Sequence, residues 1–188
     1  MMHWMMLISR QGKVRLAKWF DASTTAQRAA IMRDVVTLVL PRPSVMCNVV
    51  EWTSPPLPPS SPSPSGSSAS PSSASLARKL IYRRYASLYF VLCISDGDNE
   101  LAALETVHLY VESLDKYFGN VCELDVIFNF DRAYFLADEL FLGGHLQESN
   151  RATVLRNARA ADELAERVVK FSEKDAAARR AAGVTSRV

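Results

Sequence analysis

The sequence predicts an α+β domain in which an antiparallel sheet is flanked by helices. The first observation is the order of the periodic segments: two strands, one helix, three strands, and then only helices. The second is that short turns join neighbouring strands, which favours an antiparallel meander. We expect the folded domain to span residues 1–165, with an interruption at 53–77, and to be followed by an Ala-, Arg- and Lys-rich tail at 166–188.

The N-terminal segment predicts a β-hairpin. Residues 2–8 are apolar and of strand length, and residues 9–12 form a turn in which Gly12 is free to adopt a positive φ. Residues 13–20 alternate as a second strand does. Its apolar and basic residues are expected on opposite faces: Val14, Leu16 and Phe20 on one, Lys13 and Arg15 on the other.

A helix is predicted to follow this hairpin. Thr24 and Gln27 have the spacing of a capping box, in which each side chain bonds to the backbone of the other residue. Apolar residues then recur at helical spacing: Ile31, Val35, Leu38 and Val39. The helix must end by Leu40, because the prolines at 41 and 43 cannot continue it.

The rest of the domain is predicted to contain three strands and then helices. The strands are expected at 46–52, 79–84 and 88–94. A helix of about five turns follows, with an apolar stripe formed by Leu101, Leu104, His108, Val111, Leu114 and Phe118. Shorter helices are expected at 121–130 and 132–141, closed by two glycines. A last helix starts near Asn150 and directs five residues inward: Val154, Leu155, Ala158, Ala161 and Leu164. After Arg167 we expect a frayed helix or disorder.

Residues 53–77 differ sharply in composition from their surroundings. They contain seven of the nine prolines and eleven serines, and their only bulky apolar residues are Leu57 and Leu76. Such a segment cannot bury enough apolar surface to offset its chain entropy, so we expect a disordered insertion. It can be a tolerated surface insertion, the product of a misassigned coding boundary, or a phosphorylated binding loop.

Composition and charge argue against several functional classes. The formal net charge of +2 is too small to indicate a nucleic-acid-binding protein. The three cysteines stand apart in apolar runs, so we expect reduced, buried thiols and neither a disulfide framework nor a metal site. Residues 1–8 lack the flanks of a signal peptide, and no apolar run approaches the ~20 residues that span a bilayer.

The sequence contains no pattern that indicates catalysis. It has no glycine-rich phosphate loop, no Gly-x-Ser-x-Gly motif and no paired histidines at metal-binding spacing. His3, His108 and His145 are scattered singly, and His108 fits a hydrogen-bonded structural role on the long helix. Asp138 and Glu139 are neighbours on a helix and point about 100° apart, which makes a poor acid–base pair. We therefore expect no enzyme, no cofactor and no metal ion.

Two segments crowded with aromatic and apolar residues, 83–90 and 120–130, resemble the signature stretches of clathrin adaptor complex sigma (small) subunits. Arg-Arg-Tyr-Ala-Ser-Leu-Tyr-Phe stands at 83–90, and Asn-Val-Cys-Glu-Leu-Asp-Val-Ile-Phe-Asn-Phe at 120–130. Ser-Arg-Gln-Gly-Lys at 9–13 resembles the opening hairpin of the family. The resemblance covers about 1–52 and 78–165. Details such as Trp52, Ser87 and the run 114–119 are similar to the trans-Golgi and endosomal type, adaptor protein complex one.

This resemblance implies a longin-like (SNARE-like) fold and membership of a heterotetramer with two large adaptin subunits and one medium subunit. Clathrin and the membrane would be reached only indirectly, through the complex. The implied location is cytoplasmic and peripheral, on trans-Golgi network and endosomal membranes and on clathrin-coated vesicles. No nucleic-acid partner is implied.

The resemblance also implies a binding site for acidic dileucine signals in the cytosolic tails of membrane proteins. Such a signal is an acidic residue, any three residues, and then Leu followed by Leu or Ile. The pockets for the two leucines would be lined by Ala86, Leu88, Val111, Asn120, Val121, Leu124 and Val126. Arg15 would bind the acidic residue, because a guanidinium forms charge-assisted hydrogen bonds with a carboxylate.

Three alternatives remain open at this stage. Without the resemblance, the apolar residues of the site fit core positions and Arg15 fits an exposed strand arginine. The chain can also be the sigma subunit of the plasma-membrane endocytic adaptor, or a purely structural brace that touches no cargo.

Overall fold

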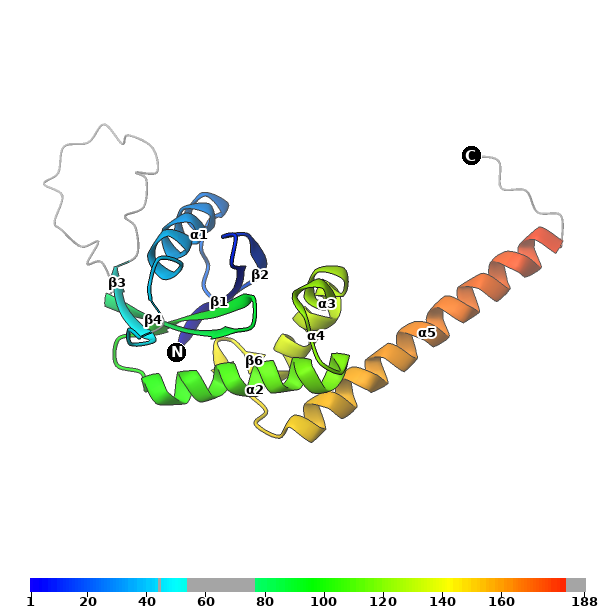
Figure 1. The fold of residues 1–188 in the computed structure, drawn as a ribbon. Helices are drawn as coiled ribbons and strands as arrows, with labels where there is room; N and C mark the ends of the chain where they lie inside the picture. Colours follow the sequence, from blue (N-terminus) through cyan, green and yellow to red (C-terminus); the bar gives the residue numbers. More distant parts are fainter. Residues whose placement is uncertain (44, 54–76, 182–188) are drawn as a thin grey trace, which may run out of the picture.

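The computed structural model describes residues 1–43, 45–53 and 77–181, and it confirms the predicted α+β, longin-like fold. Five strands form an antiparallel sheet in the order β2-β1-β5-β4-β3 (Figure 1). Their bounds are Met2–Ser9 (β1), Val14–Trp19 (β2), Val49–Thr53 (β3), Ala77–Tyr85 (β4) and Leu88–Ser95 (β5). The helices are Thr25–Val39 (α1), Glu100–Phe118 (α2), Glu123–Phe128 (α3), Phe130–Leu140 (α4) and Arg151–Ala181 (α5).

Helices cover both faces of the sheet. On one face α1 buries Ile31, Val35 and Val39 against Trp4 and other strand residues. The opposite face packs against α2, α4 and the start of α5. Because both faces are covered, β1 is buried along nearly its whole length, which explains its continuous apolar sequence.

The capping box at the start of α1 forms as predicted. The Thr24 side chain accepts a hydrogen bond from the Gln27 amide, and the Gln27 side chain accepts one from the Thr24 amide. Leu40 is the C-cap residue, directly before Pro41. The helix therefore begins and ends where its local sequence predicts.

The predicted alternation along β2 is wrong at its start, because a β-bulge interrupts it. Ile8 pairs with Val14 while Leu7 pairs with Leu16, so Arg15 is the extra residue. Val14 consequently packs on the α1 side of the sheet, whereas Leu16 belongs to the core on the other side. The three apolar residues expected on one face are thus divided between the two faces.

The buried faces of two helices also differ from the predicted ones. Leu101 is 75% exposed on α2, and the residues that α2 buries are Ala103, Val107, Tyr110, Ser113 and Leu114. On α5, Val154 and Ala158 are buried as expected, but Leu164 is 60% exposed. Leu164 is exposed because α5 extends past its neighbours and leaves the domain after its first turns (Figure 1). The helix continues beyond Arg167 to Ala181.

A short hairpin that the sequence did not predict follows α4. Phe141–Leu142 (β6) pairs with His145–Leu146 (β7) around Gly143 and Gly144, which both have positive φ. The Gly144 carbonyl oxygen accepts a hydrogen bond from the Met2 amide at 2.9 Å. The hairpin thereby connects the helical layer to the end of β1.

Most of the predicted insertion lies outside the described residues. Its two ends, Thr53 and Ala77, pair with each other as the last residues of β3 and β4. The described chain therefore stops and resumes at paired positions on two neighbouring strands. Within the described ranges, no helix is both long enough and apolar enough to cross a membrane.

The prediction that all three cysteines are buried is wrong for two of them. Cys93 is buried in β5, and burial raises the pKa of its thiol to about 12. Cys47 and Cys122 are exposed. All three are free thiols in the structure.

Candidate peptide-binding site

A cavity of about 140 Å³ lies where the β4–β5 turn meets α2 and the segment after α2; we call it the leucine slot. Five residues predicted for peptide binding line it: Ala86, Leu88, Val111, Val121 and Val126. Leu88 and Val126 are buried, while Val111 and Val121 are half-buried and Ala86 is exposed. The slot therefore has an apolar floor and an accessible rim.

The end of α2 brings distant parts of the slot together. Gly119 caps the helix with φ of 70°, and Asn120 follows with φ of 67°, so the chain reverses direction there. The Asp115 side chain accepts a hydrogen bond from the Val121 amide at 3.2 Å. These interactions hold the start of α3 over the slot.

The opposite wall is the tight turn between β4 and β5. Ala86 adopts a left-handed conformation with φ of 49°, which is uncommon for a residue with a side chain. Next to it, the Tyr85 hydroxyl and His108 Nδ1 lie 3.1 Å apart, and the two rings are stacked. Burial raises the pKa of Tyr85. The hydrogen bond confirms the predicted structural role of His108 and connects the turn to α2.

Arg15 lies beside the slot and is joined to it through Glu123. Arg15 Nη2 and Nε lie 2.9 and 3.0 Å from Glu123 Oε1, and Glu123 lines the slot. Because Arg15 is the extra residue of the bulge in β2, its side chain reaches α3 on the same side of the sheet as Leu16. Both partners are about three-quarters buried, so the pair is partly shielded from water.

Two predicted residues do not line the slot. Leu124 is 59% exposed, and Asn120 is exposed at the turn after α2. Six lining residues were missed: Tyr85, Ser87, Phe90, Leu114, Cys122 and Glu123. Two of these had a usable signal, since Phe90 shares a strand face with Leu88 and Leu114 lies one helical turn after Val111. Glu123 had none, because its partner is 108 residues away in the sequence.

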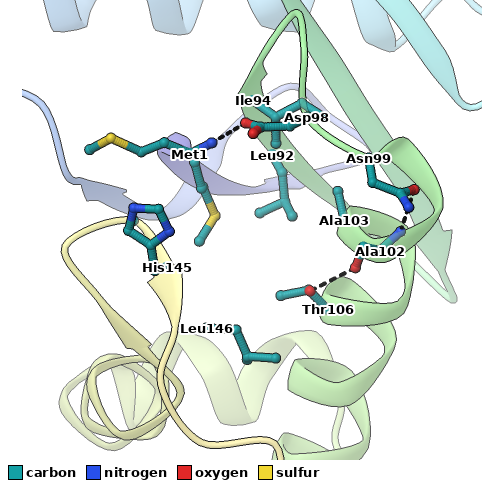
Figure 2. A pocket seen from close by; sticks show the side chains of 12 residues that line it. Met1, Leu92, Ile94, Asp98, Asn99, Ala102, Ala103, Thr106, His145 and Leu146 are labelled. Atoms are coloured by element: carbon teal, nitrogen blue, oxygen red, sulfur yellow. Dashed lines mark hydrogen bonds and ion pairs between the residues drawn. The ribbon is translucent and has the colours of Figure 1, made fainter.

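A second cavity, of about 200 Å³, lies at the other end of α2, where the N-terminus meets the β6–β7 hairpin (Figure 2). The Met1 amino group pairs with Asp98, which lowers the pKa of that carboxyl. Figure 2 shows Leu92 and Leu146 on opposite sides of this space. None of the residues predicted for peptide binding lines it. Across the described residues, no three histidine, cysteine or acidic side chains are grouped as a metal site requires.

The slot-forming segments lie within the part of the chain that matches a known family model. The model of the clathrin adaptor complex small chain matches residues 1–57 and 67–165. The chain belongs to this family. The two matched stretches include every residue of the leucine slot and Arg15, and leave out nine residues of the predicted insertion.

Curated relatives identify the branch of the family to which the chain is similar. AP-1 complex subunit sigma-1 of Schizosaccharomyces pombe is 49% identical over 157 residues, covering 84% of this chain and 83% of the relative. AP-1 complex subunit sigma-1 of Arabidopsis thaliana is 45% identical over 166 residues, covering 88% and 89%. Human AP-1 complex subunit sigma-1A is 43% identical over 166 residues, covering 88% and 90%. The chain is thus an adaptor sigma subunit, similar to those of AP-1.

A chain of another adaptor assembly has a similar fold. One chain of a homology model of the full-length AP-3 complex, in a stretched open conformation, superposes with a TM-score of 0.61 at 24% identity. The match covers 91% of this chain and 99% of the other. At that identity the likeness concerns the fold alone.

Proposed function

We propose that this sigma subunit binds acidic dileucine signals and thereby selects membrane cargo for transport between the trans-Golgi network and endosomes. The observation that carries the proposal is an apolar slot that ends beside a partly buried guanidinium. An acidic dileucine signal presents the complementary groups, which are two apolar side chains and an upstream carboxylate. The subunit would act by binding rather than by catalysis, within a complex of two large adaptins and one medium subunit.

The size of the slot fits a peptide side chain. At about 140 Å³ it is smaller than the ~300–1,000 Å³ typical of sites for drug-sized ligands. Full burial of one leucine stabilises a complex by about 1.5–3 kcal/mol. Ordering a flexible tail costs about 0.5–1.5 kcal/mol for each immobilised side chain, so only part of this gain appears as affinity and weak binding is expected.

Arg15 would supply selectivity for the acidic residue. In the free chain its guanidinium is paired with Glu123, so a cargo carboxylate exchanges one ion pair for another. The acidic peptide therefore gains only a modest advantage over a neutral one, because Glu123 competes for the same guanidinium. This advantage is the selectivity for acidic signals, since selectivity is the difference between the two affinities.

The location at the trans-Golgi network and endosomes rests on similarity to AP-1 sigma subunits. The nearest alternative is the endocytic adaptor at the plasma membrane, which imaging of a tagged chain distinguishes. Membrane attachment and clathrin recruitment would occur through the other subunits of the complex.

The decisive experiment introduces a charge into the slot. Val111→Asp in the assembled complex should lower the affinity for an acidic dileucine peptide by more than about 30-fold, because a carboxylate would occupy the apolar rim. Fluorescence anisotropy with a labelled peptide measures this loss. Ala102→Asp is the matched control, since it places the same side chain in the exposed first turn of the same helix.

Equal peptide binding by Val111→Asp and the wild type would refute the slot as the binding site. If neither complex bound any dileucine peptide although both assembled, the subunit would be a structural brace. Size-exclusion chromatography of each complex separates both outcomes from a failure of assembly.

A further inference from the structure

A separate cavity of about 480 Å³ lies on the other side of the β4–β5 turn from the leucine slot. Arg42 from the loop after α1 and Arg83 and Arg84 from β4 line it, and we call it the arginine pocket. The guanidinium of Arg83 lies over the Tyr85 ring, which packs on the leucine-slot side of the sheet, so the charge of the pocket comes from Arg42 and Arg84. Tyr82 and Tyr89 also line it and pack on the α1 side of the sheet. Leu88 and Phe90 of the leucine slot pack on the opposite side.

The arginine pocket has positive charge without a counterion from the part of the chain that the structure describes. Arg42, Arg83 and Arg84 form no ion pair with any of the described residues, and no acidic side chain lines the pocket. Four other arginines of the domain each pair with a carboxylate: Arg15, Arg78, Arg132 and Arg151. Unpaired guanidinium groups within one concave site favour an anionic ligand.

Aromatic side chains hold these guanidinium groups in place. Arg42 lies 5.8 Å from the centre of the Tyr82 ring and donates a hydrogen bond to the Tyr82 hydroxyl at 3.1 Å. Arg84 lies 5.8 Å from the centre of the Tyr89 ring, and its Nε donates to the Ala86 carbonyl oxygen at 3.2 Å. An arginine that is already oriented loses less entropy when it binds a carboxylate or phosphate.

The two cavities meet at Ala86, which lines both of them. A peptide with its acidic residue at Arg15 and its leucines in the slot runs from the β2 side of the sheet toward β4. Its next residues would then leave over the β4–β5 turn. A sheet with its side chains is about 10 Å thick, so about three or four extended residues reach the other side.

We propose that the arginine pocket binds a carboxylate or phosphate on the cargo tail, about three or four residues after the leucine pair. This inference rests on the proposed function, because it assumes a peptide in the leucine slot. It extends the recognised signal beyond the two leucines. A tail with acidic residues, or with a phosphoserine, at these positions would be preferred over a neutral tail.

The test compares three peptides on the assembled complex. All contain the same acidic dileucine signal, followed by a neutral serine segment, an aspartate segment, or a segment with phosphoserine. We expect the anionic peptides to bind roughly five- to tenfold more tightly, the range for two partly exposed ion pairs. This preference should decrease as the salt concentration rises.

Two substitutions assign the preference to the arginine pocket. The double variant Arg42→Gln and Arg84→Gln keeps an N–H donor at each position but removes the charge, so it should lose the preference and retain serine-peptide binding. Arg33→Gln is the control, because Arg33 is exposed on α1 and does not line the pocket. A preference that is absent in the wild type, or unchanged in the double variant, would overturn the inference.

Other outcomes are equally informative. If the double variant loses binding to vesicles that contain a phosphoinositide but keeps the peptide preference, the pocket binds lipid headgroups and the inference is wrong. Loss of serine-peptide binding in Val111→Asp shows that the leucine slot functions. The proposed function can therefore succeed while the arginine pocket fails, and the two failures are distinguishable.

Discussion

The side chain of Arg15 is directed by a single irregularity of the backbone. Regular alternation would place it on the face opposite to Leu16, away from α3. The bulge between Val14 and Leu16 instead brings it to Glu123 on the slot side of the sheet. Glu123 therefore has two roles in the free chain, because it lines the slot and neutralises the arginine proposed for cargo.

Removing the charge of Glu123 should tighten binding of acidic signals. In Glu123→Gln, Arg15 no longer has a competing carboxylate, so we expect acidic dileucine peptides to bind about threefold to fivefold more tightly. A peptide with glutamine in place of its acidic residue should bind unchanged. Anisotropy titrations of both peptides on the assembled complex measure the difference.

Arg15→Ser serves as the companion variant. It should weaken the acidic peptide until it matches the neutral one, and a structural brace would be indifferent to this change. If Glu123→Gln weakens both peptides equally, the glutamate only supports the wall of the slot, and the proposed competition is absent.

At the scale of single elements, the β6–β7 hairpin depends on its second glycine. Gly144 has φ of 82°, and a Cβ at this position would overlap the carbonyl group of Met2. The Met2 amide also donates to the Gly144 carbonyl oxygen. The hairpin can approach β1 closely only because no side chain separates the two backbones.

Gly144→Ala should accordingly destabilise the domain. We expect a loss of about 2 kcal/mol or more in the free energy of unfolding, from the positive φ and the steric overlap together. Gly97→Ala is the control, because a Cβ there meets no atom within 4 Å, and its effect should stay within about 0.5 kcal/mol. Chemical denaturation of the purified chain measures both variants. Equal stabilities would mean that the hairpin moves away from β1 without cost.

At the scale of the whole molecule, the sheet is enclosed between α1 and a helical layer, and α5 projects from that layer (Figure 1). The start of α5 packs on the domain through Val154 and Ala158. Farther along, Leu164, Val168 and Phe171 are exposed. The family model ends at residue 165, so most of this projecting part lies beyond the matched stretch.

The assembly of the adaptor should depend on the domain rather than on the projecting end of α5. A tagged chain should co-purify with two large subunits and one medium subunit, and a chain shortened after Arg167 should do the same. Mass spectrometry of the purified material identifies the chains. If the shortened chain no longer co-purifies with the other subunits, the exposed apolar residues near Phe171 contact one of them. Capture of no adaptor subunits would contradict the proposed membership.

The leucine slot shows that an apolar sequence pattern predicts burial but does not predict a binding site. Leu88 and Val126 are buried, as the core interpretation of an apolar run expects, and they line the slot as well. Burial alone therefore does not separate a floor residue from a core residue. Only the family resemblance predicted these positions as a binding site, and it did so without Tyr85 or Glu123.

By itself, the sequence determined the order and type of the five sheet strands and the main helices. These features depend on periodicity, capping and proline positions, which act over a few residues. Tertiary structure decided which side of the sheet Arg15 reaches, which face α2 buries, and which distant residues become partners. Arg42 and Arg84 come to line one cavity, and Arg15 comes to pair with Glu123, only after strand register and helix packing are set. Each pair is separated by many residues whose path no local pattern specifies.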